Sequence, residues 1–257
     1  APLVKHPGIR HVTFTGSVPT GINVMREAAA NVTRVLLELG GKSPIVVLAD
    51  ADLDEAADGV IGAIYENAGQ ICSAGSRLVV DRRIHDALLD KVIARIGKLK
   101  MSHGLRGGNF GPLNSAEQLA RVTGHVDRAR ERGLSILTGG KATHDPDTGT
   151  GWFFEPTVID AVPADDPAVQ EEIFGPVLVV QSFSDEAEAL ALANGTNFGL
   201  VAGVYTKDLS AAHRLARDID AGQVFINEYF AGGIEVPFGG NKLSGFGREK
   251  GLEAVKA

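Results

Sequence analysis

The sequence contains one cysteine, two methionines and one tryptophan among its 257 residues. Because Cys72 has no second cysteine to pair with, the disulfide-stapled scaffolds of small secreted proteins are excluded. No apolar run approaches the roughly 20 residues that a membrane-spanning helix needs. The first residues also lack the charged-then-apolar order of a signal peptide. The sequence therefore predicts a cytoplasmic protein with no membrane partner.

Clusters of lysine and arginine are missing as well. The formal net charge is −7, whereas a surface that binds nucleic-acid phosphates needs clustered positive charge. None of the seven histidines is spaced with a second ligand as a metal site requires. We therefore expect no nucleic-acid partner and no metal.

Glycine, by contrast, is abundant. Thirty-two glycines punctuate short β-branched apolar runs, which alternate with alanine-rich amphipathic stretches. This alternation is typical of an α/β fold. The expected strands are His11–Thr15, Arg34–Leu39, Ile45–Leu48, Leu78–Asp81, Thr157–Ala161, Val177–Phe183, Leu200–Tyr205 and Gln223–Ile226. The expected helices are Val18–Ala30, Ala51–Asn67, Ile84–Leu99, Ala116–Arg132, Asp185–Ala193 and Leu209–Asp218.

The segment Phe14–Ser17 ends the first expected strand and begins the first expected helix. Gly16 allows a ligand to approach the backbone, and Ser17 is placed to cap the helix. Free N–H groups and the helix dipole attract anions at such a terminus. The segment is therefore a candidate phosphate site, although a capped helix after a strand is also common in α/β folds without any ligand.

Two residues are candidates for covalent chemistry. Cys72 lies among small and polar neighbours in the run Gly69–Arg77, and reactivity explains its retention better than cross-linking does. Glu38 lies 34 residues earlier in an apolar run, a setting that raises the pKa of a carboxyl group and suits a general base. The alternatives are a small buried thiol packed as a hydrophobe and a surface charge at a strand end.

Five motifs occur in an order that resembles the aldehyde dehydrogenase superfamily: FTGS, LELGGKSP, GQICSAGSR, EEIFGPV and PFGGNKLSGFGRE. The resemblance runs across essentially the whole chain and covers roughly the C-terminal half of a typical member. It implies an aldehyde dehydrogenase-like α/β catalytic domain with parts of a Rossmann-type coenzyme-binding domain. Residues 1–40 would be the C-terminal part of the NAD(P)-binding domain, 41–243 the catalytic domain and 244–257 a truncated return segment to the coenzyme domain.

The resemblance also implies a reaction, the NAD(P)-dependent oxidation of an aldehyde to a carboxylic acid. Cys72 matches the nucleophile, which forms a thiohemiacetal and then a thioester, and Glu38 matches the base that activates water to hydrolyse the thioester. The cofactor is NAD or NADP. The implied cofactor-binding residues are Glu172 on the nicotinamide-side ribose, Phe174 beside it, Thr15 and Leu39 near the nicotinamide, and Gly16, Ser17 and Gly21 on the pyrophosphate side.

Two positions are substrate candidates by the same resemblance. Phe238 matches a position that lines the aldehyde tunnel, although it is as easily a packing residue. Glu66 stands where many relatives place an aromatic, and a carboxylate there would favour a cationic or strongly polar aldehyde by Coulomb attraction. The alternative is a Glu66 side chain that points into solvent. Other charged residues in these motifs are expected to be structural: Lys42 in a turn, solvated or capping a carbonyl, and Arg77 and Arg248 in ion pairs.

The family's oxyanion-holding asparagine and its adenosine-ribose contacts precede Ala1 in the family pattern. We therefore expect a fragment with little dehydrogenase activity alone, drawn from a longer protein that forms a homo-oligomer. A coenzyme-A-acylating relative is the nearest alternative, but such relatives generally lack a base at the position of Glu38. An inert or partner-binding protein that retains the fold is the other alternative.

Overall fold

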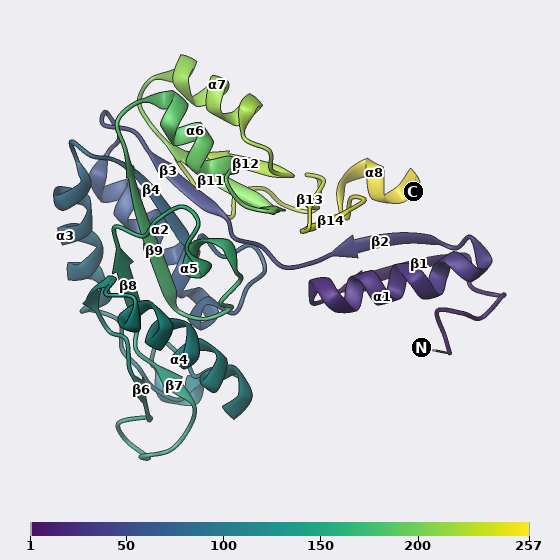
Figure 1. The fold of residues 1–257 in the computed structure, drawn as a ribbon, viewed down its shortest axis with the longest axis horizontal. Coiled ribbons are helices and arrows are strands. Elements are labelled where there is room, and N and C mark those ends of the chain that lie inside the picture. Colours follow the sequence, from purple (N-terminus) through teal and green to yellow (C-terminus); the bar gives the residue numbers. More distant parts are fainter. Residues whose placement is uncertain (1, 257) are drawn as a thin grey trace.

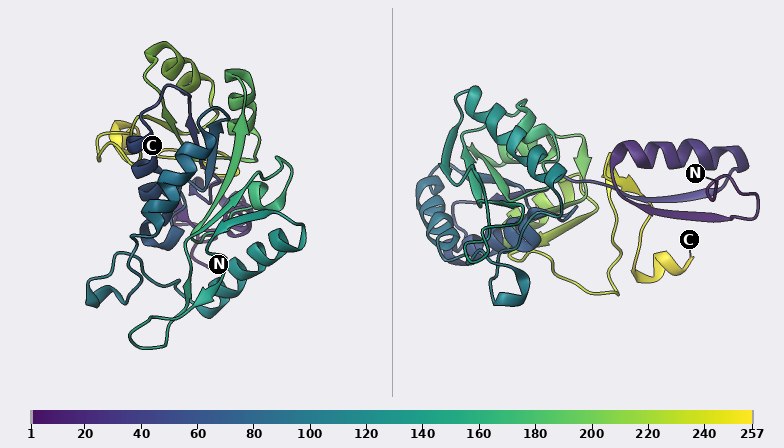
Figure 2. Two further views of the ribbon diagram at one scale, coloured as in Figure 1. Left: turned by 90° about the vertical axis from the view of Figure 1, so that its left-hand side faces the viewer. Right: turned by 90° about the horizontal axis from the view of Figure 1, so that it is seen from below.

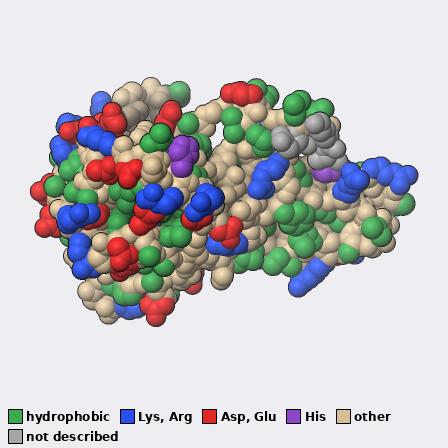
Figure 3. Space-filling view, turned by 90° about the horizontal axis from the view of Figure 1, so that it is seen from above, with side chains coloured by type: hydrophobic (Ala, Val, Ile, Leu, Met, Phe, Trp, Pro, Cys, Tyr) green, Lys and Arg blue, Asp and Glu red, His purple; other side chains and the backbone are tan. Residues whose placement is uncertain are grey.

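The computed structural model describes residues 2–256, in which two larger β-sheets, of seven and three strands, are accompanied by two small sheets of two strands each. A seven-stranded sheet with helices on both faces makes the larger part of the molecule, and a three-stranded sheet with one long helix projects from it (Figure 1). Seen from a perpendicular direction, the projecting part is narrow, and both ends of the chain lie in it (Figure 2). In the space-filling view, acidic and basic side chains are interspersed over the larger part (Figure 3).

The larger sheet has the order β12-β11-β3-β4-β9-β8-β5, and its strands are parallel except for β5, which is antiparallel to β8. A parallel sheet with both faces covered requires strands that are apolar throughout, and the four residues of β3 are all buried. The strands are β3 (Pro44–Val47), β4 (Arg77–Asp81), β5 (Ser135–Thr138), β8 (Thr157–Asp160), β9 (Val177–Phe183), β11 (Val201–Tyr205) and β12 (Gln223–Ile226).

Alternate residues of these strands face two separate hydrophobic clusters. Ile45 and Val47 pack with α2 (Leu53–Tyr65) and α3 (His85–Ile96), together with α4 (Ala116–Glu131) and α5 (Pro167–Gln170). Val46 packs on the opposite face with α6 (Glu186–Asn194) and α7 (Leu209–Asp218). Most of these helices begin at a side chain that accepts backbone N–H groups, such as Asp52 for α2 and Ser115 for α4.

The smaller sheet contains β1 (His11–Thr15), β2 (Arg34–Glu38) and β14 (Gly245–Phe246), with β2 in the centre. β1 runs parallel to β2 and β14 runs antiparallel to it, so Glu38 pairs with Thr15 on one side and with Gly245 on the other. Helix α1 (Val18–Ala28) lies along the β1–β2 pair (Figure 1). The chain returns through this sheet to α8 (Gly251–Lys256).

Several elements differ from the sequence-based expectation. The second helix ends at Tyr65 because a 3₁₀ turn follows at Glu66–Gly69, in which Asn67 and Ala68 have left-handed φ angles of 49° and 54°. Ser17 precedes α1, but its side chain makes no capping hydrogen bond and contacts the Thr20 hydroxyl at 3.0 Å. The short strands were not predicted because two-residue pairings leave no periodic pattern: β6 (Ala142–Thr143), β7 (Phe153–Phe154), β10 (Phe198–Gly199) and β13 (Asn241–Lys242).

Candidate active site

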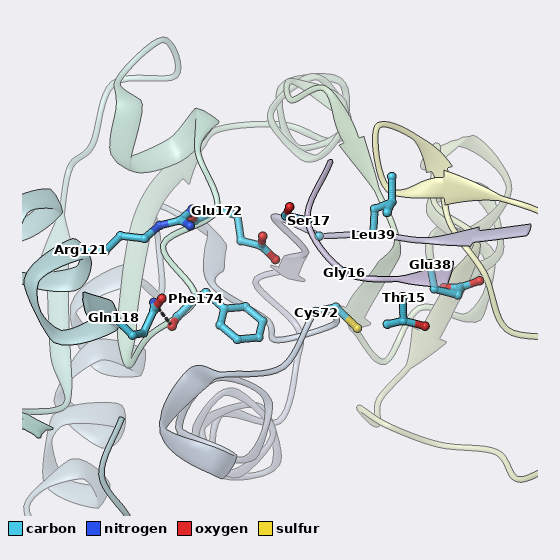
Figure 4. Close-up of a pocket in the computed structure, with 11 residues that line it drawn as sticks. Thr15, Gly16, Ser17, Glu38, Leu39, Cys72, Gln118, Arg121, Glu172 and Phe174 are labelled. Carbon is cyan, nitrogen blue, oxygen red and sulfur yellow. Dashed lines mark hydrogen bonds between the residues drawn. The ribbon is translucent and has the colours of Figure 1, made fainter. Parts of the chain in front are cut away.

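A cavity of about 350 Å³ lies where the two sheets meet (Figure 4). It is at the carboxyl ends of β1 and β2 and at the amino ends of β3, β4 and β9, so that loops from both sheets converge on it. Its walls are formed by Thr15, Gly16, Ser17, Glu38, Leu39, Gly40, Cys72, Gln118, Arg121, Glu172 and Phe174. Eight of these eleven are residues that the sequence singled out.

Cys72 is the half-buried residue at the floor of this cavity. The turn that carries it is fixed by Gln70, whose side chain donates to the Asn67 carbonyl at 3.1 Å and accepts from the Asn114 amide at 2.8 Å. Burial raises the pKa of the Cys72 thiol, and the negative charges of Glu172 and Glu38 raise it further. In the structure as it stands the thiol is therefore favoured over the thiolate at neutral pH.

Glu38 is the last residue of β2 and is only 2% exposed. Neither carboxyl oxygen has a hydrogen-bond partner among the described residues. Burial raises the pKa of Glu38 to about 8, the charge of Glu249 adds to this rise, and Arg248 opposes it. The reading of Glu38 as a surface charge at a strand end is therefore wrong. The protonated form is favoured at pH 7, and the ionised form is a strong proton acceptor.

The two side chains point in different directions. In Figure 4 the Cys72 sulfur points toward the side of the cavity where Thr15 and Glu38 lie, while the carboxyl group of Glu38 points past Thr15. An added Cβ on Gly239 would lie 2.9 Å from Glu38 Oε1, which places the carboxyl group beside Gly239. A rotation of the Glu38 side chain would be needed to bring its carboxyl group toward the sulfur.

Glu172 forms the opposite wall, in the segment after α5. The backbone N–H of Gly41 donates to Glu172 Oε1 at 3.0 Å. Arg121 donates to the carbonyl of Glu172 at 2.6 Å, and Gln118 donates to the carbonyl of Phe174 at 2.7 Å. The backbone of Phe174 is left-handed, with φ 57°, and turns its ring toward the cavity. Helix α4 therefore holds this segment in place from outside.

Gln118 and Arg121 are cavity residues that the sequence reasoning missed. They lie one helical turn apart near the start of α4, so that they share a face. The only sequence signal was this i, i+3 spacing of two polar residues in an amphipathic helix, which ordinary solvent-facing residues also show. Their place in the cavity depends on a contact with residues more than fifty positions away.

The loop that joins the two sheets passes very close to Cys72 and Glu172. A Cβ on Gly41 would collide with the backbone carbonyl of Cys72, and a Cβ on Gly40 would collide with the carboxylate of Glu172. Positions 40 and 41 therefore require glycine, because a side chain at either one would push Glu172 or the Cys72 turn away from the loop.

Three of the predicted site residues lie outside the cavity. Gly21 is buried in α1 against the side chain of Leu39, where it allows close packing of helix on strand. Glu66 is exposed and lines a separate hollow of about 490 Å³ beside Tyr229 and Phe230. Phe238 is half-buried and exchanges two backbone hydrogen bonds of 2.7 Å with Glu249. Their roles in ligand binding stay predictions.

The expectations for the other charged residues are corrected by the structure. Lys42 is not solvated and caps no carbonyl: it is 1% exposed and its ammonium has no hydrogen-bond partner among the described residues. Arg77 forms no ion pair within the described chain; its buried guanidinium donates to the carbonyls of Lys42, Leu192 and Ala193 at 2.7–2.8 Å. Arg248 likewise bonds to the carbonyls of Gly240 and Gly247 and to the Asn241 side chain.

Among residues 2–256, no group of three or more His, Cys, Asp or Glu side chains is arranged to hold a metal ion. Within the same range, the helices are too short or too polar to cross a bilayer.

Comparison with known proteins gives consistent matches over the whole chain. The model of the Aldehyde dehydrogenase family matches residues 1–257. Betaine aldehyde dehydrogenase of Bacillus subtilis (strain 168) is 44% identical over 250 residues, which are 97% of this chain and 51% of that relative. The human 4-trimethylaminobutyraldehyde dehydrogenase is 42% identical over 257 residues, 99% of this chain and 52% of that relative.

Solved structures agree with the sequence matches. A crystal structure of a point mutant of Staphylococcus aureus betaine aldehyde dehydrogenase in complex with NAD⁺ superposes with a TM-score of 0.96 at 40% identity, covering 99% of this chain and 52% of that one. An indole-3-acetaldehyde dehydrogenase in complex with NAD⁺ gives a TM-score of 0.95 at 42% identity, covering 99% and 52%. The chain thus spans about half the length of the relatives it matches.

Proposed function

The chain belongs to the aldehyde dehydrogenase family, and from this we propose that its cavity oxidises an aldehyde to a carboxylic acid, with Cys72 as nucleophile and Glu38 as general base. The observation that carries the proposal is the convergence of these two residues with Glu172 on one cavity between the two sheets. Because this chain holds both Cys72 and Glu38, we also propose that it corresponds to the C-terminal half of the family's fold, including the catalytic domain. The activity is proposed for the whole protein.

The cavity fits a nicotinamide coenzyme, which supplies a hydride acceptor when bound. Glu172 offers a half-buried carboxylate, and such a group suits sugar hydroxyls because it accepts hydrogen bonds. Gly16 and Ser17 line the cavity at the start of α1, where backbone N–H groups favour anions. Relatives that superpose on the chain have been crystallised with NAD⁺. NAD or NADP is the proposed cofactor.

Cys72 and Glu38 have different roles in the proposed reaction. The Cys72 thiol gives its proton to ionised Glu38, which passes it to solvent, and the sulfur adds to the aldehyde carbon. A carbon–sulfur bond forms, and the electron pair of the carbonyl π bond moves to the oxygen as an oxyanion. After oxidation, the same carbon is held to Cys72 as a thioester. Glu38, once ionised and rotated inward, accepts a proton from water as the water oxygen attacks the thioester carbon, and the thiol of Cys72 is released with the acid.

Glu66 supports a finer proposal about the aldehyde. Glu66 lines a hollow together with Glu228, Tyr229 and Phe230, and carboxylates and aromatic rings attract cations. The human relative is named for a trimethylamino aldehyde. In a longer protein, Glu66→Gln should lower kcat/KM for cationic aldehydes several-fold relative to neutral aliphatic ones. An unchanged ratio would contradict this part.

The main test measures formation of reduced nicotinamide coenzyme by this chain and by a longer chain, with NAD⁺ or NADP⁺ and a panel of aldehydes. Cys72→Ala should abolish turnover, and Glu38→Gln should reduce it by at least about 100-fold, the usual contribution of a general base. Substantial turnover by the short chain alone would contradict the expectation of little activity. Turnover that depends on coenzyme A would instead favour an acylating enzyme.

A further inference from the structure

Cys72 and Ser73 are the two central residues of a tight turn, which is closed by a hydrogen bond of 3.0 Å from the Ala74 N–H to the Ile71 carbonyl. In such a turn the direction of each side chain follows from the orientation of the peptide units on either side of it. The Cys72 sulfur reaches the cavity from this turn (Figure 4). Contacts that fix these peptide units therefore also fix the direction of the sulfur.

The peptide unit between Ser73 and Ala74 is held at both of its polar atoms. Its N–H closes the turn, and its carbonyl accepts a hydrogen bond of 3.0 Å from the hydroxyl of Tyr229. Ser73 is 7% exposed, and a buried carbonyl that lacks a donor is unfavourable. The Tyr229 hydroxyl therefore satisfies this carbonyl and keeps the peptide unit from rotating.

Tyr229 lies 156 residues after Ser73, in the segment that follows β12. Its ring lies against Gly203 of β11, where an added Cβ would come within 2.9 Å of the ring atom Cδ2. The rings of Phe225 and Phe230 pack on it, with centroids 5.4 Å and 4.8 Å from its own. The hydroxyl is therefore carried by a ring that the larger sheet and two aromatic side chains hold in place.

We propose that Tyr229 is a positioning residue for the nucleophile, whose hydroxyl fixes the Ser73 carbonyl and thereby holds the Cys72 sulfur directed into the cavity. This inference rests on the proposed function, in which Cys72 attacks the aldehyde carbon. A reacting group that is misplaced by about 1 Å can slow a reaction about 100-fold. The Cys72 carbonyl on the other side of the turn meets Gly41 without a hydrogen bond between them, so the bond from Tyr229 is the directional one.

The direct experiment measures alkylation of Cys72, the only cysteine, by iodoacetamide as a function of pH in the 257-residue chain. It needs neither aldehyde nor coenzyme. Tyr229→Phe keeps the ring and removes the hydroxyl, so the Ser73 carbonyl turns toward water and the turn opens. Because burial raises the pKa of the Cys72 thiol, exposure of the sulfur should lower the midpoint of the pH profile by on the order of one unit and make alkylation at pH 7 several-fold faster.

Tyr65→Phe is the matched control. The buried Tyr65 hydroxyl also donates to a backbone carbonyl at 3.0 Å, that of Thr157 in β8, so the substitution removes a hydrogen bond of the same kind and length. Both variants should lose stability in urea unfolding, but only Tyr229→Phe should change the alkylation profile. An unchanged profile in folded Tyr229→Phe would overturn the inference, as would an equal change in both variants.

A second variant covers a failure of Tyr229→Phe to fold. In Gly203→Ala the new Cβ would press on the Tyr229 ring and displace its hydroxyl from Ser73, while Cys72 and its turn stay unsubstituted. Alkylation should again become faster at pH 7. If only this variant folded, an unchanged profile would overturn the inference.

Kinetics separate this inference from the proposed function. In a longer protein, Tyr229→Phe should lower kcat for aldehyde oxidation by about tenfold or more and leave NAD⁺ affinity unchanged, because positioning of the sulfur acts on the covalent step. A loss of NAD⁺ affinity as large as the loss of kcat would indicate a general disturbance and contradict the inference. If the unsubstituted longer protein oxidised no aldehyde, the proposed function would fail, whereas the effect of Tyr229 on alkylation of Cys72 would stand.

Discussion

Glu38 is a buried side chain whose surroundings are unfavourable for stability. Both of its carboxyl oxygens are buried without a donor, and Glu249 lies near enough to disfavour its charge. A fold optimised for stability alone would pair or replace such a group, since an unpaired buried carboxylate is costly. The same environment suits the proposed role of Glu38 as a general base, because it brings the pKa of the carboxyl group to about 8.

Replacement of Glu38 by Gln should therefore make the protein more stable at alkaline pH. The pKa of Glu38 is raised from 4.5 to about 8, so the folded state keeps a proton that the unfolded state loses above pH 4.5. The stability contributed by this proton is full below 4.5 and is lost as the pH rises through 8. The unfolding free energy of Glu38→Gln minus that of the unsubstituted chain should rise with pH over this window.

The limiting slope is about 1.4 kcal/mol per pH unit, the value for one proton. Urea unfolding at several pH values between 5 and 8 measures it. Glu131→Gln makes the same chemical change at an exposed position and serves as the control. A difference that is flat with pH would mean that Glu38 ionises as freely as it does in the unfolded chain.

At the scale of elements, the loop that joins β2 to β3 connects the two sheets at the cavity. Residues 39–43 carry the chain from the carboxyl end of one sheet to the amino end of the other, and on this path they pass Cys72 and Glu172. The Cys72 turn is likewise shaped by two left-handed residues, Asn67 and Ala68. Strained and close-fitting backbone of this kind is tolerated only where surrounding contacts hold it.

Gly41→Ala and Gly62→Ala should have opposite effects on stability. The new Cβ at position 41 would meet the Cys72 carbonyl, whereas position 62 in α2 has open space. We expect Gly41→Ala to lower the unfolding free energy by about 1–3 kcal/mol, as overpacking usually does. Gly62→Ala should raise it by up to about 1 kcal/mol, because alanine favours a helix. Equal effects in urea unfolding would show that the loop has room to move away from Cys72.

At the scale of the whole molecule, the two sheets differ in how many buried hydrophobic residues pack against them. The larger sheet has a hydrophobic cluster on each face. The smaller sheet is covered by α1, which buries only Gly21 and Ala28. Because the cavity lies between the two sheets, its geometry depends on the smaller sheet as much as on the larger one.

Hydrogen exchange should show this difference directly. Amides of β1 should exchange faster than those of β4 by on the order of 100-fold or more, because elements with few buried apolar contacts open at lower free energy. Mass spectrometry of peptides that cover His11–Thr15 and Arg77–Asp81 would measure it. Equal protection of the two strands would indicate that the sheets open as one cooperative unit.

The sequence by itself determined the α/β class and many of the elements, since these follow from local patterns. The strands His11–Thr15, Val177–Phe183 and Gln223–Ile226 and the helix Leu209–Asp218 have the predicted bounds. Periodicity and turn residues act over a few positions, so they can be read along the chain. The motif order was enough to indicate the family, which the comparisons confirmed.

Only the tertiary structure decided which charged side chains are buried and what faces them. The sequence left Glu38 open between a buried base and a surface charge, and it predicted the wrong surroundings for Lys42 and Arg77. It did not distinguish Gln118 and Arg121, which lie in the cavity wall, from ordinary solvent-facing residues of an amphipathic helix. Burial and charge pairing depend on contacts such as that between Gly41 and Glu172, which are 131 residues apart. Such contacts exist only once the two sheets are packed together, so no local pattern could contain them.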